Sequence, residues 1–243
     1  MKKLLAYLLL GLPLIAMAED YQSTLLVQTG TLKESDLIVR IVTDLASEKT
    51  CLAFYVRTSG TSPVMSCYDA RGGFKSDISQ VGHFKKGKLV VRKIKDRLNH
   101  ISCVVAYTST PGTSPAINCY NSDSKAKDDI KRTGHLREGD LEIERVIDAD
   151  STNTCLVAFV SVSSNTPSLV CYPSKPGSKG GLSQDSYMRE GDLVVRKILD
   201  EANHKECLVS YVSTEGTSPH IYCFDQKKAP ATAPPPPLAP GRQ

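Results

Sequence analysis

The feature that most constrains this chain is a fixed spacing of its eight cysteines. They form four pairs: the first cysteine recurs every 52 residues, and the second always follows 16 residues later, without insertion or deletion. A constant period near 50 residues is typical of repeat architectures, in which each repeat is one supersecondary unit. The spacing therefore predicts four tandem units. The pairs are Cys51 and Cys67, Cys103 and Cys119, Cys155 and Cys171, and Cys207 and Cys223.

Other residue types recur with the same period. An aromatic residue follows every second cysteine, a leucine begins a β-branched run in every unit, and an aspartate ends that run. Aspartate at the end of a strand is typical of a side chain that caps backbone amides in the following turn. Because a catalytic site would need such a residue only once, the fourfold recurrence favours a structural role over acid–base chemistry. The aspartates are Asp44, Asp96, Asp148 and Asp200.

Each unit has the pattern of an antiparallel sheet. In the fourth unit, residues 193–199, 207–212 and 220–224 are rich in β-branched and aromatic residues and are separated by turn-forming stretches. A weaker strand precedes these, near Leu25 to Val27 in the first unit and at Ile78, Ile130 and Leu182 in the others. Helical periodicity is absent beyond the first 18 residues. The predicted fold class is all-β, with three- to four-stranded antiparallel repeats.

The predicted boundaries are 19–73, 74–125, 126–177 and 178–225 for the four repeats. Two assemblies fit them. One is a four-bladed propeller with one sheet per unit. The other is a pair of sandwich or barrel domains, each made from two repeats. Details shared by alternate units favour the second, but the motif Arg-Glu-Gly-Asp-Leu joins units three and four, and the sequence leaves both open.

The cysteines are predicted to form disulfides inside each unit. Two strands joined by a short loop bring positions 16 residues apart opposite each other, within disulfide reach. Bridges between neighbouring units, such as Cys67 to Cys103, are the alternative, but they would leave unmatched cysteines at both ends. Zinc ligation is disfavoured, because zinc sites use cysteines two to four residues apart with further ligands nearby.

The first 18 residues have the pattern of a cleaved signal peptide. Lys2 and Lys3 precede an apolar run from Leu4 to Ile15, and Ala16-Met17-Ala18 presents small residues for cleavage after Ala18. The run is short for a membrane span, which disfavours the alternative of an uncleaved anchor. The short, lysine-led signal indicates a bacterial protein that is periplasmic or secreted, where disulfides are stable.

The mature chain is nearly neutral and ends in a proline-rich tail. Removing the signal leaves 28 basic and 26 acidic residues, because 30 basic residues lose Lys2 and Lys3. A balance of +2 with both signs interspersed gives no basic footprint for nucleic acid. Residues 226–243 contain a run of prolines, which predicts an extended or disordered tail that forms neither helix nor sheet ladder.

No catalytic, metal or cofactor site is predicted. The sequence has no nucleophile elbow, phosphate-binding glycine loop, HExxH helix or calcium loop. The five histidines have no acid or thiol partner at a ligand spacing, so they are interpreted as exposed turn residues. They are His83, His100, His135, His204 and His220.

The leading hypothesis from sequence is a non-enzymatic protein-binding or scaffold module of the bacterial envelope, without stable membrane insertion after cleavage. A repeat array presents near-equivalent surface positions, and partner specificity is expected where the units differ. Two rivals remain: a hydrolase-like enzyme with its site at a unit junction, marked by a cavity holding a residue such as His220 or Tyr187, and a self-associating structural surface protein. The candidate partner surface is Lys88, Glu144, His83, His135, Tyr187 and His220.

Overall fold

The computed structural model describes residues 26–71, 75–122, 129–149, 152–161, 165–175, 180–214 and 216–226. The predicted signal peptide and the tail beyond residue 226 lie outside these ranges. The described residues form sixteen antiparallel strands in four four-stranded sheets, which confirms the predicted all-β repeat class. None of the described segments is a helix suited to crossing a membrane.

Each sheet is a simple meander built within one predicted repeat. Unit 1 contains β1 (Leu26–Glu34), β2 (Leu37–Asp44), β3 (Lys49–Val56) and β4 (Val64–Asp69). Unit 2 contains β5 (Ile78–Lys86), β6 (Leu89–Asp96), β7 (Ile101–Thr108) and β8 (Ala116–Asn121). Unit 3 contains β9 (Ile130–Glu138), β10 (Leu141–Asp148), β11 (Asn153–Val160) and β12 (Ser168–Pro173). Unit 4 contains β13 (Leu182–Glu190), β14 (Leu193–Asp200), β15 (Lys205–Val212) and β16 (His220–Asp225).

The first strand of each unit is longer than the sequence pattern suggested. It runs for nine residues and pairs with the second strand through a two-residue turn. The first turn residue has positive φ and is glycine in three units, at Gly87, Gly139 and Gly191. Such a turn matches the right-handed twist of the flanking strands. It fixes the register of the hairpin and sets the second turn residue at the rim of the sheet.

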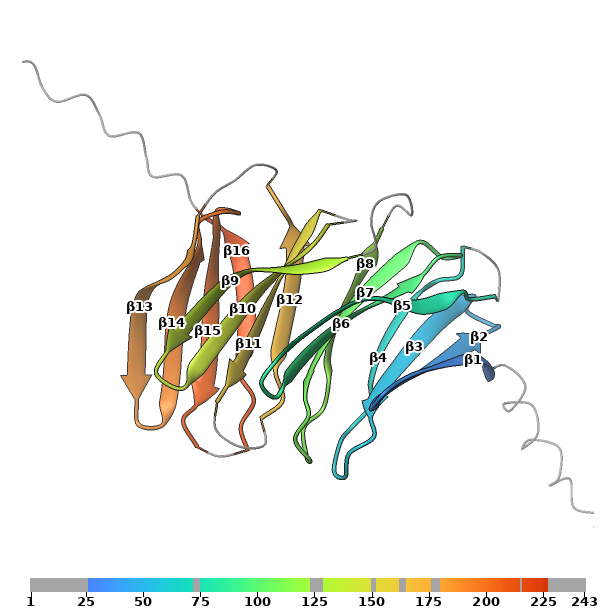
Figure 1. Ribbon diagram of the computed structural model, residues 1–243, viewed down its shortest axis with the longest axis horizontal. Coiled ribbons are helices and arrows are strands. Elements are labelled where there is room, and N and C mark those ends of the chain that lie inside the picture. Colours follow the sequence, from blue (N-terminus) through green and yellow to red (C-terminus); the bar gives the residue numbers. More distant parts are fainter. Residues whose placement is uncertain are drawn as a thin grey trace, which may run out of the picture.

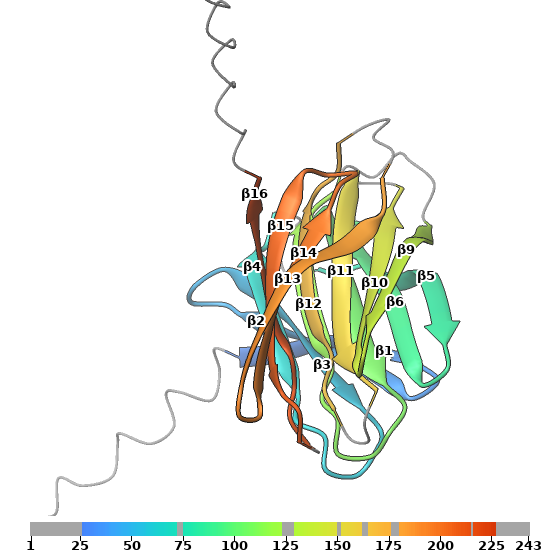
Figure 2. The ribbon, with the colours of Figure 1, turned by 90° about the vertical axis from the view of Figure 1, so that its left-hand side faces the viewer.

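The four sheets stack face to face in a single open row (Figure 1). Three cores join consecutive sheets: one lies between units 1 and 2, one between units 2 and 3, and one between units 3 and 4. Figure 2, viewed from the unit 4 end, shows β13–β16 in front of the other sheets. Each unit therefore obtains its core from its neighbours, as expected for a solenoid-like array.

This arrangement corrects both assemblies considered from sequence. A propeller would join the last sheet to the first, but units 1 and 4 lie at opposite ends of the row, and no core cluster of the described residues joins them. Two separate domains would leave units 2 and 3 without a shared core, but Val91 and Val104 of unit 2 pack with Val146 and Val157 of unit 3. The described sheets therefore form one continuous stack, in which one face of unit 1 and one face of unit 4 have no neighbouring sheet.

Every sheet has two distinct faces. We call the face turned toward the next unit the trailing face; in unit 1 it carries Leu37 and Leu52. We call the face turned toward the preceding unit the leading face; in unit 2 it carries Ile94 and Val105. In unit 2 both faces are covered, and β6 and β7 are buried at every residue. β7 is accordingly almost wholly apolar, whereas β6 also buries charged side chains, among them Lys93 and Asp96.

All four disulfides form within units, as the sequence predicted. The paired cysteines lie directly opposite each other on the third and fourth strands, with Cα atoms 4.0 Å apart. They lie on the leading face, so the neighbouring unit covers them. Cys103, Cys155 and Cys207 are at most 1% exposed. In unit 1 no sheet of the described residues covers the leading face, and Cys51 is half-buried while Cys67 is exposed.

We expect the bridge Cys51–Cys67 to be reduced first, because a reductant must reach a sulfur atom and only this bridge lies on an uncovered face. The measurement is limited reduction under native conditions, alkylation of the released thiols and peptide mass spectrometry. The bridge Cys103–Cys119 serves as the matched buried control. Equal alkylation of both bridges at early times would contradict the uncovered end.

Candidate functional site

The junctions between units are held by hydrogen bonds from a recurring tyrosine to a recurring aspartate. The hydroxyl of the aromatic residue after the second cysteine donates to the aspartate that ends the second strand of the next unit. The distance is 2.7 Å from Tyr68 to Asp96, and the same from Tyr120 to Asp148 and from Tyr172 to Asp200. Burial, together with the adjacent carboxylate, raises the pKa of Tyr68 and Tyr172 far above its usual range.

Two of the recurring aspartates, Asp44 and Asp96, also cap the turns that follow them, as predicted for all four. Asp44 accepts a hydrogen bond from the backbone amide of Ala46 at 3.0 Å, and Asp96 accepts one from that of Leu98 at 3.1 Å. At two junctions a cation of the preceding unit adds an ion pair: Lys93 reaches Asp148 at 2.6 Å. Arg145 reaches Asp200 at the same distance. The predicted structural role thus extends to joining units.

A second polar contact marks the rim of two junctions. Tyr107 donates to Asp36 at 2.7 Å, and its own oxygen accepts from Arg92 at 2.8 Å. The junction of units 3 and 4 repeats this contact: Tyr211 donates to Asp140 at 2.8 Å and accepts from Arg196 at 3.0 Å. The middle junction differs, because Phe159 and Lys88 occupy the tyrosine and aspartate positions.

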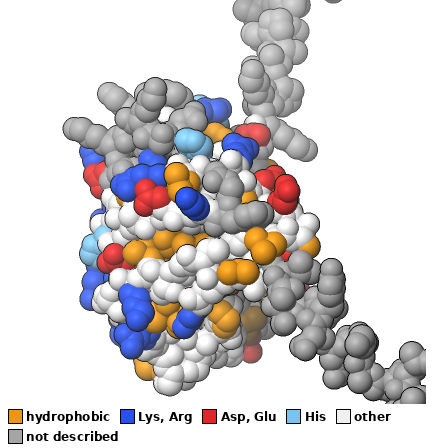
Figure 3. Space-filling view, turned by 90° about the vertical axis from the view of Figure 1, so that its right-hand side faces the viewer, with side chains coloured by type: hydrophobic (Ala, Val, Ile, Leu, Met, Phe, Trp, Pro, Cys, Tyr) orange, Lys and Arg blue, Asp and Glu red, His pale blue; other side chains and the backbone are white. Residues whose placement is uncertain are grey.

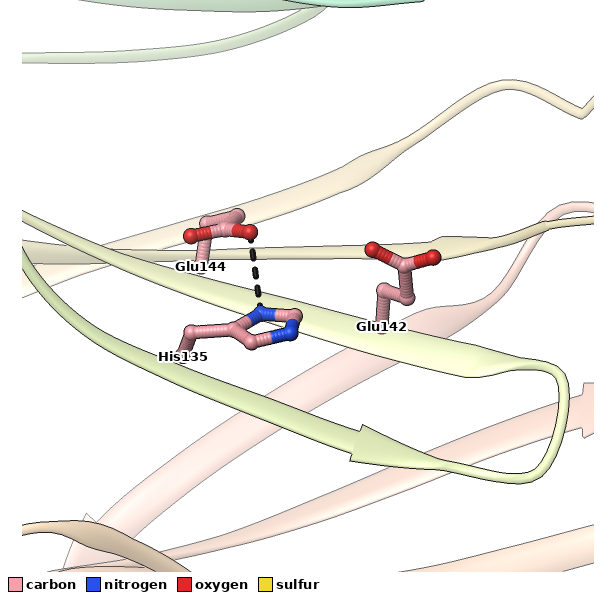
Figure 4. A group of neighbouring side chains, drawn as sticks. All are labelled: His135, Glu142 and Glu144. Carbon is pink, nitrogen blue, oxygen red and sulfur yellow. Dashed lines mark ion pairs between the residues drawn. The ribbon is translucent and has the colours of Figure 1, made fainter. Parts of the chain in front are cut away.

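At the middle junction an ion-pair cluster takes the place of this contact (Figure 4). The fully buried carboxylate of Glu144 lies 2.6 Å from the Lys86 ammonium and 2.9 Å from Nδ1 of His135. It also contacts Arg132. Glu142 lies 3.3 Å from Lys86. The buried carboxylate is thus compensated by cations from both units, which burial of a charge requires.

His135, Glu142 and Glu144 also form a group whose ligand atoms lie within 4.8 Å of one another. One imidazole and two carboxylates are donors that divalent transition metals accept. The ammonium of Lys86 lies against both carboxylates and the imidazole, at 3.2 Å from Nδ1, and supplies the positive charge that the group requires. The geometry therefore fits an ion-pair cluster that joins units 2 and 3.

A cavity of about 300 Å³ lies beside this cluster. Its wall includes Lys86, Lys88 and Thr110 of unit 2 and Phe159 and Ser161 of unit 3. It opens where the tyrosine–aspartate contact of the other junctions is missing. The hydroxyl of Ser161 donates to the backbone oxygen of Asp140, and that of Thr110 donates to Thr108. Among the described wall residues, no hydroxyl has an imidazole partner that would activate it as a nucleophile.

The structure distributes the six sequence-predicted surface residues over units 2, 3 and 4. It brings together only His135 and Glu144, and Glu144 is buried in the junction, so it cannot meet an outside partner in the folded chain. Lys88 lies on the β5–β6 turn at the cavity. His83, Tyr187 and His220 are exposed, and neither Tyr187 nor His220 lines this cavity.

The interpretation of the histidines as turn residues holds for two of them. His100 and His204 are exposed and have positive φ in the turns before β7 and β15. His83 and His135 are instead on β5 and β9, and His220 begins β16. The acid partners of His135 lie on the paired strand β10, so the spacing of residues along one strand did not predict them. The two-residue turn after Glu138 sets His135 opposite Glu144, so hairpin register would have found the pair.

The most unusual surfaces are the two uncovered faces at the ends of the row. On the trailing face of unit 4, Leu193 and Leu208 are 41% and 42% exposed, whereas the equivalent Leu37 and Leu52 are 0% exposed. On the leading face of unit 1, Met65 is 62% exposed, whereas the equivalent Ile221 is 6% exposed. Figure 3 looks onto the unit 1 end and shows hydrophobic side chains across it.

Further exposed apolar side chains extend these surfaces. Leu26 lies on β1 at the unit 1 end, and Met188 and Tyr222 lie on β13 and β16 of unit 4. Exposed apolar surface that forms a patch, as opposed to single residues, marks interaction sites. We define the terminal faces as the leading face of unit 1 and the trailing face of unit 4, and we take them as the candidate functional site.

No model of a known protein family matches the chain, and no curated protein shows significant sequence similarity to it.

Proposed function

We propose that this chain is an extracytoplasmic protein-binding or scaffold module of a bacterial cell envelope, and that its terminal faces are the binding surfaces. The observation that carries the proposal is the exposure of apolar residues at positions that are buried in the other units. Leu208 is 42% exposed, and its equivalents Leu52 and Leu156 are 0% exposed. Burying such a side chain in an interface contributes about 1.5–3 kcal/mol.

The stacked architecture supports a scaffold role. Four disulfides and three shared cores hold the row in one arrangement, so its two ends are kept at a fixed separation. The disulfides fit an oxidising compartment, and the signal pattern of residues 1–18 indicates the route to it. Preorganised faces lose little conformational entropy on binding, which favours affinity.

The test is site-specific photo-crosslinking in cells. A photoreactive amino acid replaces Met65 or Leu208 on a terminal face, and Leu98 serves as the control because it is 43% exposed on the turn before β7, away from both faces. We expect protein adducts in the envelope fraction from the first two positions and not from Leu98. Absence of adducts at the terminal faces, together with turnover of a small substrate by the purified chain, would favour the enzyme hypothesis instead.

A further inference from the structure

We propose that the partner of the terminal faces is a second copy of this chain, bound head to tail. The trailing face of unit 4 in one copy packs on the leading face of unit 1 in the next, and the contact repeats the junctions inside the chain. This inference rests on the proposed function and names its partner.

The first argument is continuity with the existing junctions. All three internal junctions pair a trailing face with a leading face, and the terminal faces are the one remaining face of each kind among the described sheets. Their residues keep the apolar character of the internal faces. Leu193, Val195 and Leu208 stand where unit 2 has Leu89, Val91 and Val104. These three residues of unit 2 are at most 1% exposed in the core shared with unit 3.

The second argument is charge and hydrogen-bond complementarity at the rim. Tyr55 accepts a hydrogen bond from Arg40 at 3.2 Å, as Tyr107 does from Arg92 and Tyr211 from Arg196. In units 2 and 4 that tyrosine donates its proton to the turn aspartate of the preceding unit. Unit 4 carries this aspartate as Asp192, on the turn that begins β14. A head-to-tail contact brings Asp192 of one copy to Tyr55 and Arg40 of the next.

The third argument is the buried ion pair. Lys93 and Arg145 occupy one position of the trailing face, and each reaches the strand-end aspartate of the next unit at 2.6 Å. Lys197 is the equivalent residue of unit 4, and Asp44 is the equivalent aspartate of unit 1. Both are charged and accessible: the side chain of Lys197 is 31% exposed, where it contacts Asp185 and Glu206. The two residues of unlike charge are therefore available to pair between copies.

The fourth argument is a pair of hydrogen bonds that join the loops before the fourth strands of units 1, 2 and 3. The backbone amide of Ser62 donates to the hydroxyl of Ser114 at 2.9 Å, and the amide of Ser114 donates to the hydroxyl of Thr166 at the same distance. At the two ends, Ser218 supplies the next amide and Ser62 supplies a hydroxyl of the same kind. A bond of the same kind can thus form between unit 4 of one copy and unit 1 of the next.

One contact of the internal junctions is missing at the ends, and the chain compensates for it. Phe224 occupies the position of the tyrosines that donate to the next unit, so it offers Asp44 no hydroxyl. The hydroxyl of Ser47 instead donates to Asp44 at 2.7 Å. The carboxylate therefore keeps two kinds of donor, a backbone amide and a hydroxyl, when a phenylalanine ring covers it.

The geometry fixes the type of assembly. The two terminal faces differ in sequence and lie at opposite ends of the row, so they cannot meet within one chain (Figure 1). In a linear dimer, one terminal face of each copy stays uncovered. Such a heterologous contact generates a series of copies, which either closes as a ring or grows as a filament.

The experiment is sedimentation of the mature chain purified from an oxidising compartment, with its four disulfides intact. We expect the average mass to rise with concentration. Leu208→Glu and Met65→Glu each block one end and are expected to weaken association at least tenfold, because a charge then enters an apolar contact. Leu98→Glu changes an equally exposed leucine on the turn before β7 and is expected to leave association unchanged.

Mixing the two blocked variants identifies the head-to-tail contact. Each variant retains one competent face, and the two retained faces are complementary, so the mixture is expected to form dimers with one copy of each and no larger species. A carbodiimide crosslink between Lys197 and Asp44 is expected in the unmodified chain. These residues lie at opposite ends of one row, so the crosslink reports contact between copies.

Three results would overturn the inference: a monomer at concentrations up to about 1 mM, a dimer that either single variant abolishes and mixing fails to restore, or carbodiimide crosslinks from Lys197 only to Asp185 and Glu206 of its own chain. Far-UV circular dichroism checks that each variant is folded. If the chain is monomeric while photo-crosslinking at Leu208 still captures a different envelope protein, the binding function stands and the partner proposed here is wrong.

Discussion

Replacing Asp148 with alanine is expected to lower the free energy of unfolding by about 3–5 kcal/mol. Asp148 and Lys93 are both fully buried, with 2.6 Å between carboxylate and ammonium. Without the carboxylate, the ammonium of Lys93 stays in the interior beside an unfilled site, and the hydroxyl of Tyr120 loses its acceptor. Removing one partner of a buried ion pair costs more than losing a typical neutral hydrogen bond. Urea unfolding of the disulfide-intact chain at neutral pH measures the change.

The repeat supplies a matched control for this substitution. Asp44 occupies the same position in unit 1, where no unit precedes it, and it accepts hydrogen bonds only from its own turn among the described residues. Asp44→Ala is therefore expected to lower the free energy of unfolding far less than Asp148→Ala, because it removes only exposed hydrogen bonds. Equal losses at the two positions would show that the buried ion pair does not stabilise the middle junction.

The replacement of Leu52 or Leu156 with alanine is expected to cost about 2–5 kcal/mol. Both side chains are fully buried in cores between consecutive sheets, so truncation removes apolar contacts and leaves a cavity. Leu208 occupies the equivalent position in unit 4 but is 42% exposed. At protein concentrations low enough to keep the chain monomeric, Leu208→Ala is expected to change stability by no more than about 0.5 kcal/mol.

This comparison tests the open row directly. A closed ring of four units would bury Leu208 against unit 1 as deeply as Leu52 is buried against unit 2, and the three substitutions would then have similar effects. A large loss for Leu208→Ala in the monomer would therefore contradict the stacking described above. Thermal unfolding followed by circular dichroism provides an independent second measurement.

The sequence was informative about the local structure because local structure here depends on short spacings. Pairs of cysteines 16 residues apart predicted bridges within units, and the structure forms all four. The predicted turn caps are confirmed at Asp44 and Asp96. The pairing of His135 with Glu144 was missed, although it follows from the two-residue turn between β9 and β10. Spacing along one strand carries no signal of a partner on the paired strand.

The contacts between units, and with them the terminal faces that lack such contacts, could not be found in the same way. The recurring tyrosines were visible as aromatic residues, but their acceptors belong to the next unit, and a tyrosine such as Tyr107 reaches back to Asp36 in the preceding one. These contacts depend on which face of a sheet meets which neighbour. The way in which one sheet packs on the next cannot be deduced from the spacing of residues within a single sheet.

The sequence by itself determined the four units, their strands, their disulfides and the residues common to all of them. Only the tertiary structure decided where the units are covered. Leu52 and Leu208 are the same residue type at the same repeat position, yet the first is fully buried and the second is 42% exposed. The physical reason is that the burial of a residue depends on the position of its unit in the row. An inner sheet has a neighbouring sheet on both faces, and a terminal sheet has a neighbouring sheet on one face only.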